Sequence, residues 1–164
     1  MISRRMARTL ERLQGVKVTP KRDMSFDRLG IRLYKDVEVE VPRWLAEVLE
    51  EEGLVEVVKI DWKVVSERLY KEKVSLTPLE LPPGMFSLIR EILESSPEDS
   101  LIRRDALALT YRRVGKMLNH LRTSIALTSK RTPKNLLPEE LILYNALRLV
   151  VDGWMSAFLG IRDE

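Results

Sequence analysis

Few residues in this sequence have the types and spacing that catalysis requires. His120 is the single histidine, and Arg113 and Lys116 precede it along the chain. A lone histidine beside cations more often faces solvent than acts as a base, and no Ser/His/Asp set can be argued from it. Residues 50–52 are three consecutive glutamates, whose carboxylates point in different directions on a helix. We therefore expect a protein that is not an enzyme.

The ligand sets of common cofactor sites are also missing from the sequence. There is no cysteine, which excludes disulfides, thiolate nucleophiles and thiolate metal sites and favours an intracellular location. No metal-spaced cluster and no glycine-rich phosphate loop is present. We expect no cofactor and no metal.

A group of basic residues is better suited to binding than to catalysis. It follows a predicted long helix into the next loop and consists of Arg112, Arg113, Lys116, Arg122, Lys130 and Arg131. Such a group can neutralise phosphates or meet an acidic protein surface. Nonspecific DNA contact, a small DNA-binding regulator that uses this helix, and a merely solvated face all stay open as interpretations.

The net charge of +3 conceals a block pattern. Residues 1–35 hold ten Lys and Arg against three Asp and Glu, a balance of +7. Residues 36–61 hold two against nine, a balance of −7, and residues 100–135 hold nine against one, a balance of +8. Such asymmetry is typical of surfaces that meet charged partners.

The first 60 residues have the pattern of a small α+β domain. An amphipathic helix ends at Gly15, and short strands are predicted at 16–20, 37–41 and 54–58, with a less regular one at 30–34. Pro42 cannot donate to a sheet but suits a helix start, so a helix follows it and ends near Gly53. The expected core consists of Val39, Val41, Trp44, Leu45, Val48 and Leu49.

Residues 61–164 have a helical pattern, which predicts a second domain. Helices are expected from Asp61, over 85–93, over about 100–129 with a start signal at Ser96 and Pro97, and over 138–158. In the long helix, a seam of apolar residues should pack against another helix: Leu107, Tyr111, Val114, Leu118, Leu121 and Ile125. The fold class is mainly α, with a small N-terminal α+β domain followed by a helical bundle of long packed helices.

The last helix is apolar nearly all round, which is unusual for the final helix of a chain of 164 residues. It is interrupted by Asn145 and Arg148 and is too short in its apolar run for a membrane span. We therefore expect an obligate oligomer, with no membrane segment. The predicted subunit interface consists of Leu141, Tyr144, Leu147, Val151, Trp154 and Phe158. A central helix in a self-contained bundle is the alternative.

Several segments together resemble subunits of the GINS complex. The join at 39–49 reads VEVPRWLAEVL, and Trp62 follows at a similar interval. Leu81, Pro82 and Pro83 resemble the family's proline-containing link, and the long helix contains TYRRVGKML. The closing helix reads LLPEELILYNALRLVVDGWMSAF. The resemblance covers about residues 37–159, and the small domain comes first, as in the archaeal two-three type.

This resemblance implies a role in DNA replication. It implies a non-catalytic structural subunit of a tetramer, formed by two copies of this type and two of a second archaeal GINS subunit. That assembly scaffolds and activates the MCM helicase, binds a RecJ-like nuclease and connects to primase and DNA polymerase. It also implies a cytoplasmic, nucleoid-associated protein of an archaeon. The small DNA-binding regulator and an unrecognised enzyme remain as alternatives.

Overall fold

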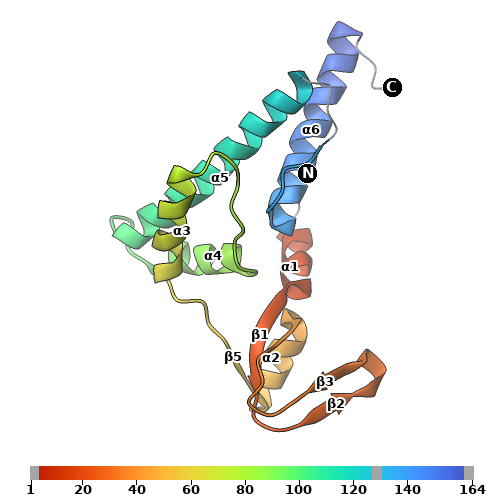
Figure 1. Cartoon of the computed structure of the whole chain (residues 1–164), viewed down its shortest axis with the longest axis vertical. Helices are drawn as coiled ribbons and strands as arrows, with labels where there is room; N and C mark the ends of the chain where they lie inside the picture. Colours follow the sequence, from red (N-terminus) through yellow and green to blue (C-terminus); the bar gives the residue numbers. More distant parts are fainter. Residues whose placement is uncertain (1–3, 127–130, 161–164) are drawn as a thin grey trace. The chain divides into compact units, whose positions relative to one another are not determined.

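The described part of the chain begins with a helix, a small sheet and a second helix, and continues with four helices (Figure 1). The computed structural model describes residues 4–126 and 131–160. The chain forms two compact units, one made of Met1–Trp62 with Pro82–Glu91 and the other of Lys63–Leu81 with Ile92–Glu164. The protein is thus mainly helical with a small N-terminal sheet region, as the fold class predicted. The division at residue 60 into separate domains stays a prediction.

The sheet of the first unit has three antiparallel strands. β1 (Gly15–Pro20) lies in the centre, between β4 (Val39–Pro42) and β5 (Val55–Val57). Val18 is paired with Val39 on one side and with Val57 on the other. α1 (Arg4–Leu13) precedes the sheet. The alternating valines thus form strands where the period of two predicted them.

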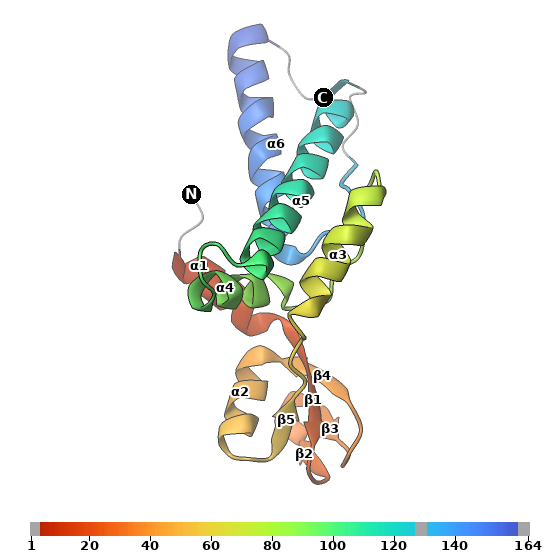
Figure 2. The same ribbon diagram turned by 90° about the vertical axis from the view of Figure 1, so that its left-hand side faces the viewer.

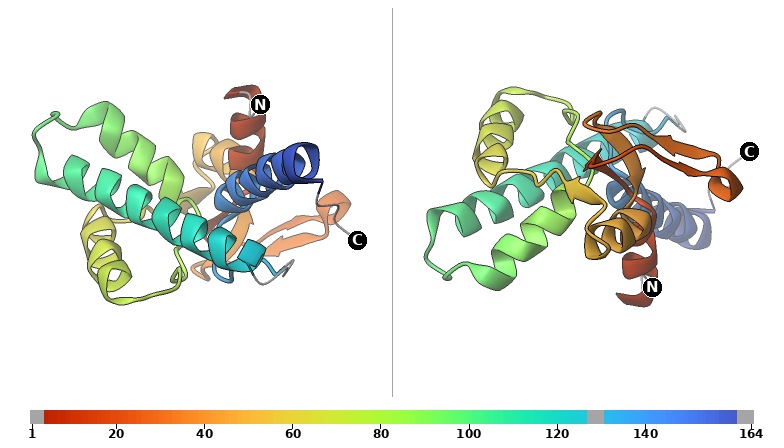
Figure 3. Two further views of the ribbon diagram at one scale, coloured as in Figure 1. Left: turned by 90° about the horizontal axis from the view of Figure 1, so that it is seen from above. Right: turned by 90° about the horizontal axis from the view of Figure 1, so that it is seen from below.

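A separate hairpin extends to one side of this sheet (Figure 3). β2 (Met24–Phe26) and β3 (Ile31–Leu33) are its strands, joined by a short 3-10 helix, η1 (Asp27–Leu29). Gly30 follows with a φ of +65°, a conformation that favours glycine. The weak strand predicted at 30–34 therefore exists, but its partner β2 gave no clear signal.

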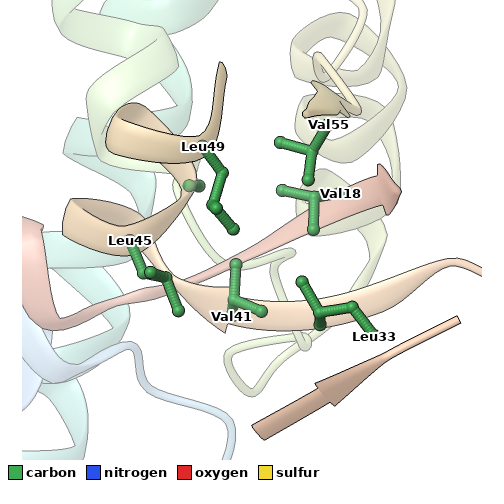
Figure 4. Packing of buried hydrophobic residues seen from close by; sticks show 7 residues of the cluster. Val18, Leu33, Val41, Leu45, Leu49 and Val55 are labelled. Carbon is green, nitrogen blue, oxygen red and sulfur yellow. The ribbon is translucent and has the colours of Figure 1, made fainter. Parts of the chain in front are cut away.

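The core of the first unit lies between the sheet and α2 (Arg43–Glu51), as Figure 4 shows. Val18, Val41, Leu45, Leu49 and Val55 are all buried there. Pro42 ends β4 and directly precedes the helix, because its φ of −56° is compatible with both. Gly53 ends the helical turn with a φ of +69°, which is the C-terminal role that the sequence predicted.

Of the six predicted core residues, three are buried, two are partly buried and packed against the core, and one is exposed. Val39 and Trp44 are half-buried, and Val48 is 48% exposed, so Val48 is not a core residue. The buried face of α2 is centred between Leu45 and Ala46, and it leaves Val48 at its edge. The small Ala46 is the residue that the apolar pattern overlooked.

The second unit is built on three helices that pack side by side. α5 (Leu101–Ala126) lies between α3 (Lys63–Val74) and α6 (Pro138–Leu159), as Figure 2 shows. α4 (Met85–Ser95) precedes α5, and its residues up to Glu91 belong to the first unit. α5 begins at Leu101, close to the predicted start at about residue 100, but Pro97 is not its first residue, because Ser100 closes a turn on the Pro97 carbonyl.

α5 and α6 run in the same direction. His120 faces Tyr144, and Ser124 faces Arg148, both at a separation of 24 residues. A constant separation is the mark of parallel helices, whereas antiparallel neighbours would show a constant sum of residue numbers. Asn135 accepts a hydrogen bond from Arg113 near the middle of α5, so the chain has returned along the helix before α6 begins.

Candidate interaction site on the last helix

The C-terminal end of α6 extends past the last described turn of α5 (Figure 1). Its large apolar side chains are exposed, among them Trp154 at 54% and Phe158 at 74%. These two rings stack one turn apart, with 5.7 Å between their centroids. The remaining exposed members are Leu149, Val150 and Leu159. An apolar surface of this kind is typical of a protein–protein contact.

The structure separates the predicted interface residues into two groups. Trp154 and Phe158 are exposed, as a contact with another chain requires. Leu147 and Val151 are half-buried and pack against the buried cluster of Met117, Leu121 and Tyr144. Leu141 is also half-buried.

Tyr144 does not belong to the predicted interface, because it is 1% exposed within this chain. Its hydroxyl lies 2.9 Å from Nδ1 of His120, and the two rings meet edge to face. The predicted interface left out Leu149 and Val150, although both are exposed on α6. The signal was available, since Val150 and Trp154 are one helical turn apart and share a face.

α5 shows a second exposed apolar strip. Leu107, Tyr111 and Leu118 of the predicted seam are exposed, and only Leu121 among the six seam residues is buried. The packed face of α5 is rotated from the seam and contains Ala106, Leu109, Arg113, Met117 and Ser124. The seam prediction is therefore correct for Val114, Leu121 and Ile125, which pack in the cluster with α6, and wrong for the three exposed residues.

Arg113 and Lys116 lie at the centre of a buried ion network rather than on a binding surface. Arg113 donates to Glu140 through Nε at 2.7 Å and Nη2 at 2.5 Å, and Nη1 lies 3.4 Å from Glu72. Lys116 Nζ donates to Glu72 Oε1 at 2.8 Å. Arg113 is 1% and Lys116 8% exposed, so neither can reach a nucleic acid. This corrects the contact role that the sequence suggested for both.

The network also fixes two loops. The carbonyls of Leu79 and Asn135 accept from Arg113, and that of Thr77 accepts from Lys116. Glu72 accepts the backbone N–H of Leu79 at 3.2 Å, and Glu140 accepts that of Leu137 at 2.9 Å. Two carboxylates thus balance two cations, and nearly all their polar atoms have partners. The arrangement suits a structural role, in which paired charges hold α3, α5 and the start of α6 together.

Glu72 and Glu140 were missed by sequence reasoning, although each left a signal. Leu69 lies four residues after Val65, and Glu72 lies three residues after Leu69, which places Glu72 on the same buried helical face. Glu140 is the third residue of α6, where a carboxylate can reach back to the residue before the helix. An acidic residue on a buried helical face indicates a buried cation elsewhere in the fold.

The other predicted basic contacts remain accessible. Arg112, Arg122 and Arg131 are exposed, and Lys130 lies outside the described residues. Arg112 also approaches the Lys73 carbonyl at 3.5 Å. The basic group of the long helix is therefore smaller than its sequence suggests, which weakens the alternative of a DNA-binding regulator built on it.

A partly buried carboxylate joins three helices of the first unit. Glu11 of α1 lies 2.9 Å from Nη2 of Arg90 and 3.9 Å from Nη1 of Arg43, and it accepts from Ser87 at 2.7 Å. Burial by itself raises the pKa of Glu11, but the hydrogen bonds of Ser87 and Arg90 and the charges of Arg90 and Arg43 outweigh it. The net result is a pKa below the ordinary 4.5.

Comparison of the sequence with models of protein families and with curated proteins finds no match. Among the described residues, no group of three or more His, Asp and Glu is placed to hold a metal ion. No described helix combines the length and apolarity that crossing a membrane demands. The geometry of α6 is therefore the main guide to function.

Proposed function

We propose that this chain is a non-catalytic structural subunit of an archaeal GINS complex of the two-three type. The exposed apolar end of α6, with Trp154 and Phe158, is the observation that carries the proposal. The order of a small sheet region followed by long helices supports it, as does the join in which Pro42 links β4 to α2. In this role the protein scaffolds and activates the MCM helicase and links it to other replisome proteins.

The proposed contact works by burial of apolar area. A stable interface buries roughly 800 Å² on each partner, and a few central aromatic residues contribute most of its free energy. Trp154 and Phe158 have that character, and Leu149 and Val150 extend the same exposed region along α6. The exposed strip of Leu107, Tyr111 and Leu118 on α5 offers a second contact for a multisubunit assembly.

The proposed partners follow from the resemblance. Two copies of this chain would join two copies of the second archaeal GINS subunit, and the tetramer would bind the MCM helicase and a RecJ-like nuclease. Through these contacts the tetramer would connect to primase and DNA polymerase. The complex would be located in the cytoplasm, at the nucleoid. An assembly built by such surfaces needs no cofactor and no catalytic residue.

Affinity capture of the tagged chain from its native cell, followed by identification of partners, tests this proposal. The wild-type chain should retain a second GINS subunit and the MCM helicase, while Trp154→Glu should lose the second subunit, because a charge cannot be buried unpaired at an apolar contact. Tyr70→Glu is the matched control, since Tyr70 is an exposed aromatic residue of α3. A wild-type chain that is a stable monomer in light scattering and captures neither partner would refute the proposal.

A further inference from the structure

α1 presents a row of three exposed arginines along one face. Arg5, Arg8 and Arg12 are separated by three and four residues, so they lie within about 60° of one another around the helix. All three are exposed, and none has a carboxylate partner among the residues that the structure describes. The row is thus a continuous ridge of positive charge.

The stability of the helix accounts for only one member of this row: Arg12 lies in the last turn, where a cation is favourable. Arg5 lies in the first turn of the described helix, where the helix dipole is positive and a cation is unfavourable, and no acidic residue lies in that turn. Like charges at i, i+3 and i, i+4 spacing also repel one another. Both effects destabilise the helix, and a polyanion bound along the row would remove both.

The acidic residue of α1 does not neutralise the row either. Glu11 is held by Arg90, Arg43 and Ser87, so its single charge already faces two guanidinium groups. The side chain of Arg90 is itself 48% exposed and adds to the positive surface of this unit. The surroundings of α1 therefore strengthen the positive potential.

We propose that Arg5, Arg8 and Arg12 bind the phosphate backbone of duplex DNA without sequence preference. The row extends over seven residues, roughly 10 Å of helix axis, and one DNA strand carries a phosphate about every 3.4 Å along its axis. Three arginines thus match about three successive phosphates, and guanidinium groups bind phosphate oxygens in a bidentate manner. The row consists of residues of α1 and includes none of α6, and the inference holds whether or not the chain is a GINS subunit.

The test is the salt dependence of binding of the full chain to a fluorescently labelled 20-base-pair DNA, followed by anisotropy. Each phosphate contact contributes about 0.9 to the slope of log affinity against log salt concentration. Replacing Arg5, Arg8 and Arg12 by Gln should therefore make this negative slope shallower by about 2.7. The helix should be retained, because Gln and Arg have similar helix propensity. Circular dichroism checks that the variant is folded.

The matched control replaces Arg22, Arg28 and Arg32 by Gln, since these exposed arginines in and beside the β2–β3 hairpin change the net charge by the same amount. Its slope should stay close to that of the wild type. Equal losses in the two variants would mean that only net charge matters and would overturn the proposal. Absence of binding at about 50 mM salt, or equally strong competition by polyglutamate, would overturn it as well, the latter in favour of an acidic protein ligand.

Discussion

Arg113 is bound on every side of its guanidinium group. Its Nε and Nη2 atoms reach Glu140, and Nη1 reaches Glu72 and the Leu79 carbonyl. A fully bonded ion pair contributes little net stability compared with an apolar core of equal volume, because desolvation opposes the attraction. Loss of one partner is different, since it leaves a buried charge without compensation.

Replacing Arg113 by Met should therefore lower the free energy of unfolding by about 3–5 kcal/mol, because Glu140 keeps its charge in a buried position. Urea denaturation followed by circular dichroism measures the change. Arg112→Met is the matched control on the neighbouring exposed position, and it should change stability by less than about 0.5 kcal/mol. Equal effects of the two substitutions would contradict the buried role of Arg113.

Glu11 predicts a pH dependence of stability. Its pKa is lowered in the folded chain below the ordinary 4.5, through a balance in which burial is outweighed by Ser87, Arg90 and Arg43. The unfolded chain then binds more protons in this range, so the contribution of Glu11 is fully present above about pH 4.5 and is lost as the pH falls through the folded pKa.

Glu11→Gln should accordingly destabilise the chain at pH 7, and the difference from the wild type should shrink as the pH is lowered toward about 3. Urea titrations at several pH values measure this. Glu47→Gln, at an exposed position of α2, serves as the control and should change stability by less than about 0.5 kcal/mol at each pH. A difference for Glu11→Gln that grows in acid would contradict the ion-pair assignment.

At the scale of the elements, apolar periodicity located most helices and strands but identified only part of the packed face of α5. The seam on α5 was predicted from its leucines, whereas the buried face includes Arg113, Lys116 and Ser124. Periodicity of apolar residues cannot reveal a face that is packed through paired charges, because the pairing residues are far apart in the sequence. Ser96 and Pro97 likewise resemble a helix start, but Pro97 begins a turn that Ser100 closes.

The register of α5 and α6 depends on Tyr144, which joins the buried cluster and bonds to His120. Tyr144→Phe should lower stability by about 0.5–1.5 kcal/mol through loss of the hydrogen bond, and Tyr144→Ala by about 3–5 kcal/mol through loss of the packed ring. Size-exclusion chromatography should show that Tyr144→Phe keeps the oligomeric state of the wild type. If Tyr144→Phe dissociated an oligomer without changing stability, Tyr144 would belong to the proposed subunit interface after all.

At the scale of the whole molecule, the order of a small sheet region and long helices could be predicted, because each element leaves a local pattern. The exposed apolar end of α6 could also be anticipated, since the sequence of this helix is apolar nearly all round. The parallel course of α5 and α6 could not, because it is set by contacts such as Arg113 with Asn135 and Glu140. The spacing of Arg5, Arg8 and Arg12 on one face of an amphipathic helix could also be predicted from the sequence.

The ion network has a consequence for the order of folding. Glu72 and Arg113 are 41 residues apart, and Arg113 and Glu140 are 27 apart, so neither pair forms by local folding of one helix. A partly assembled unit would hold Arg113 in an apolar setting with one carboxylate still missing, which is a state of high free energy. α3, α5 and the start of α6 are therefore expected to dock in a single cooperative step, and hydrogen exchange would release their amides together.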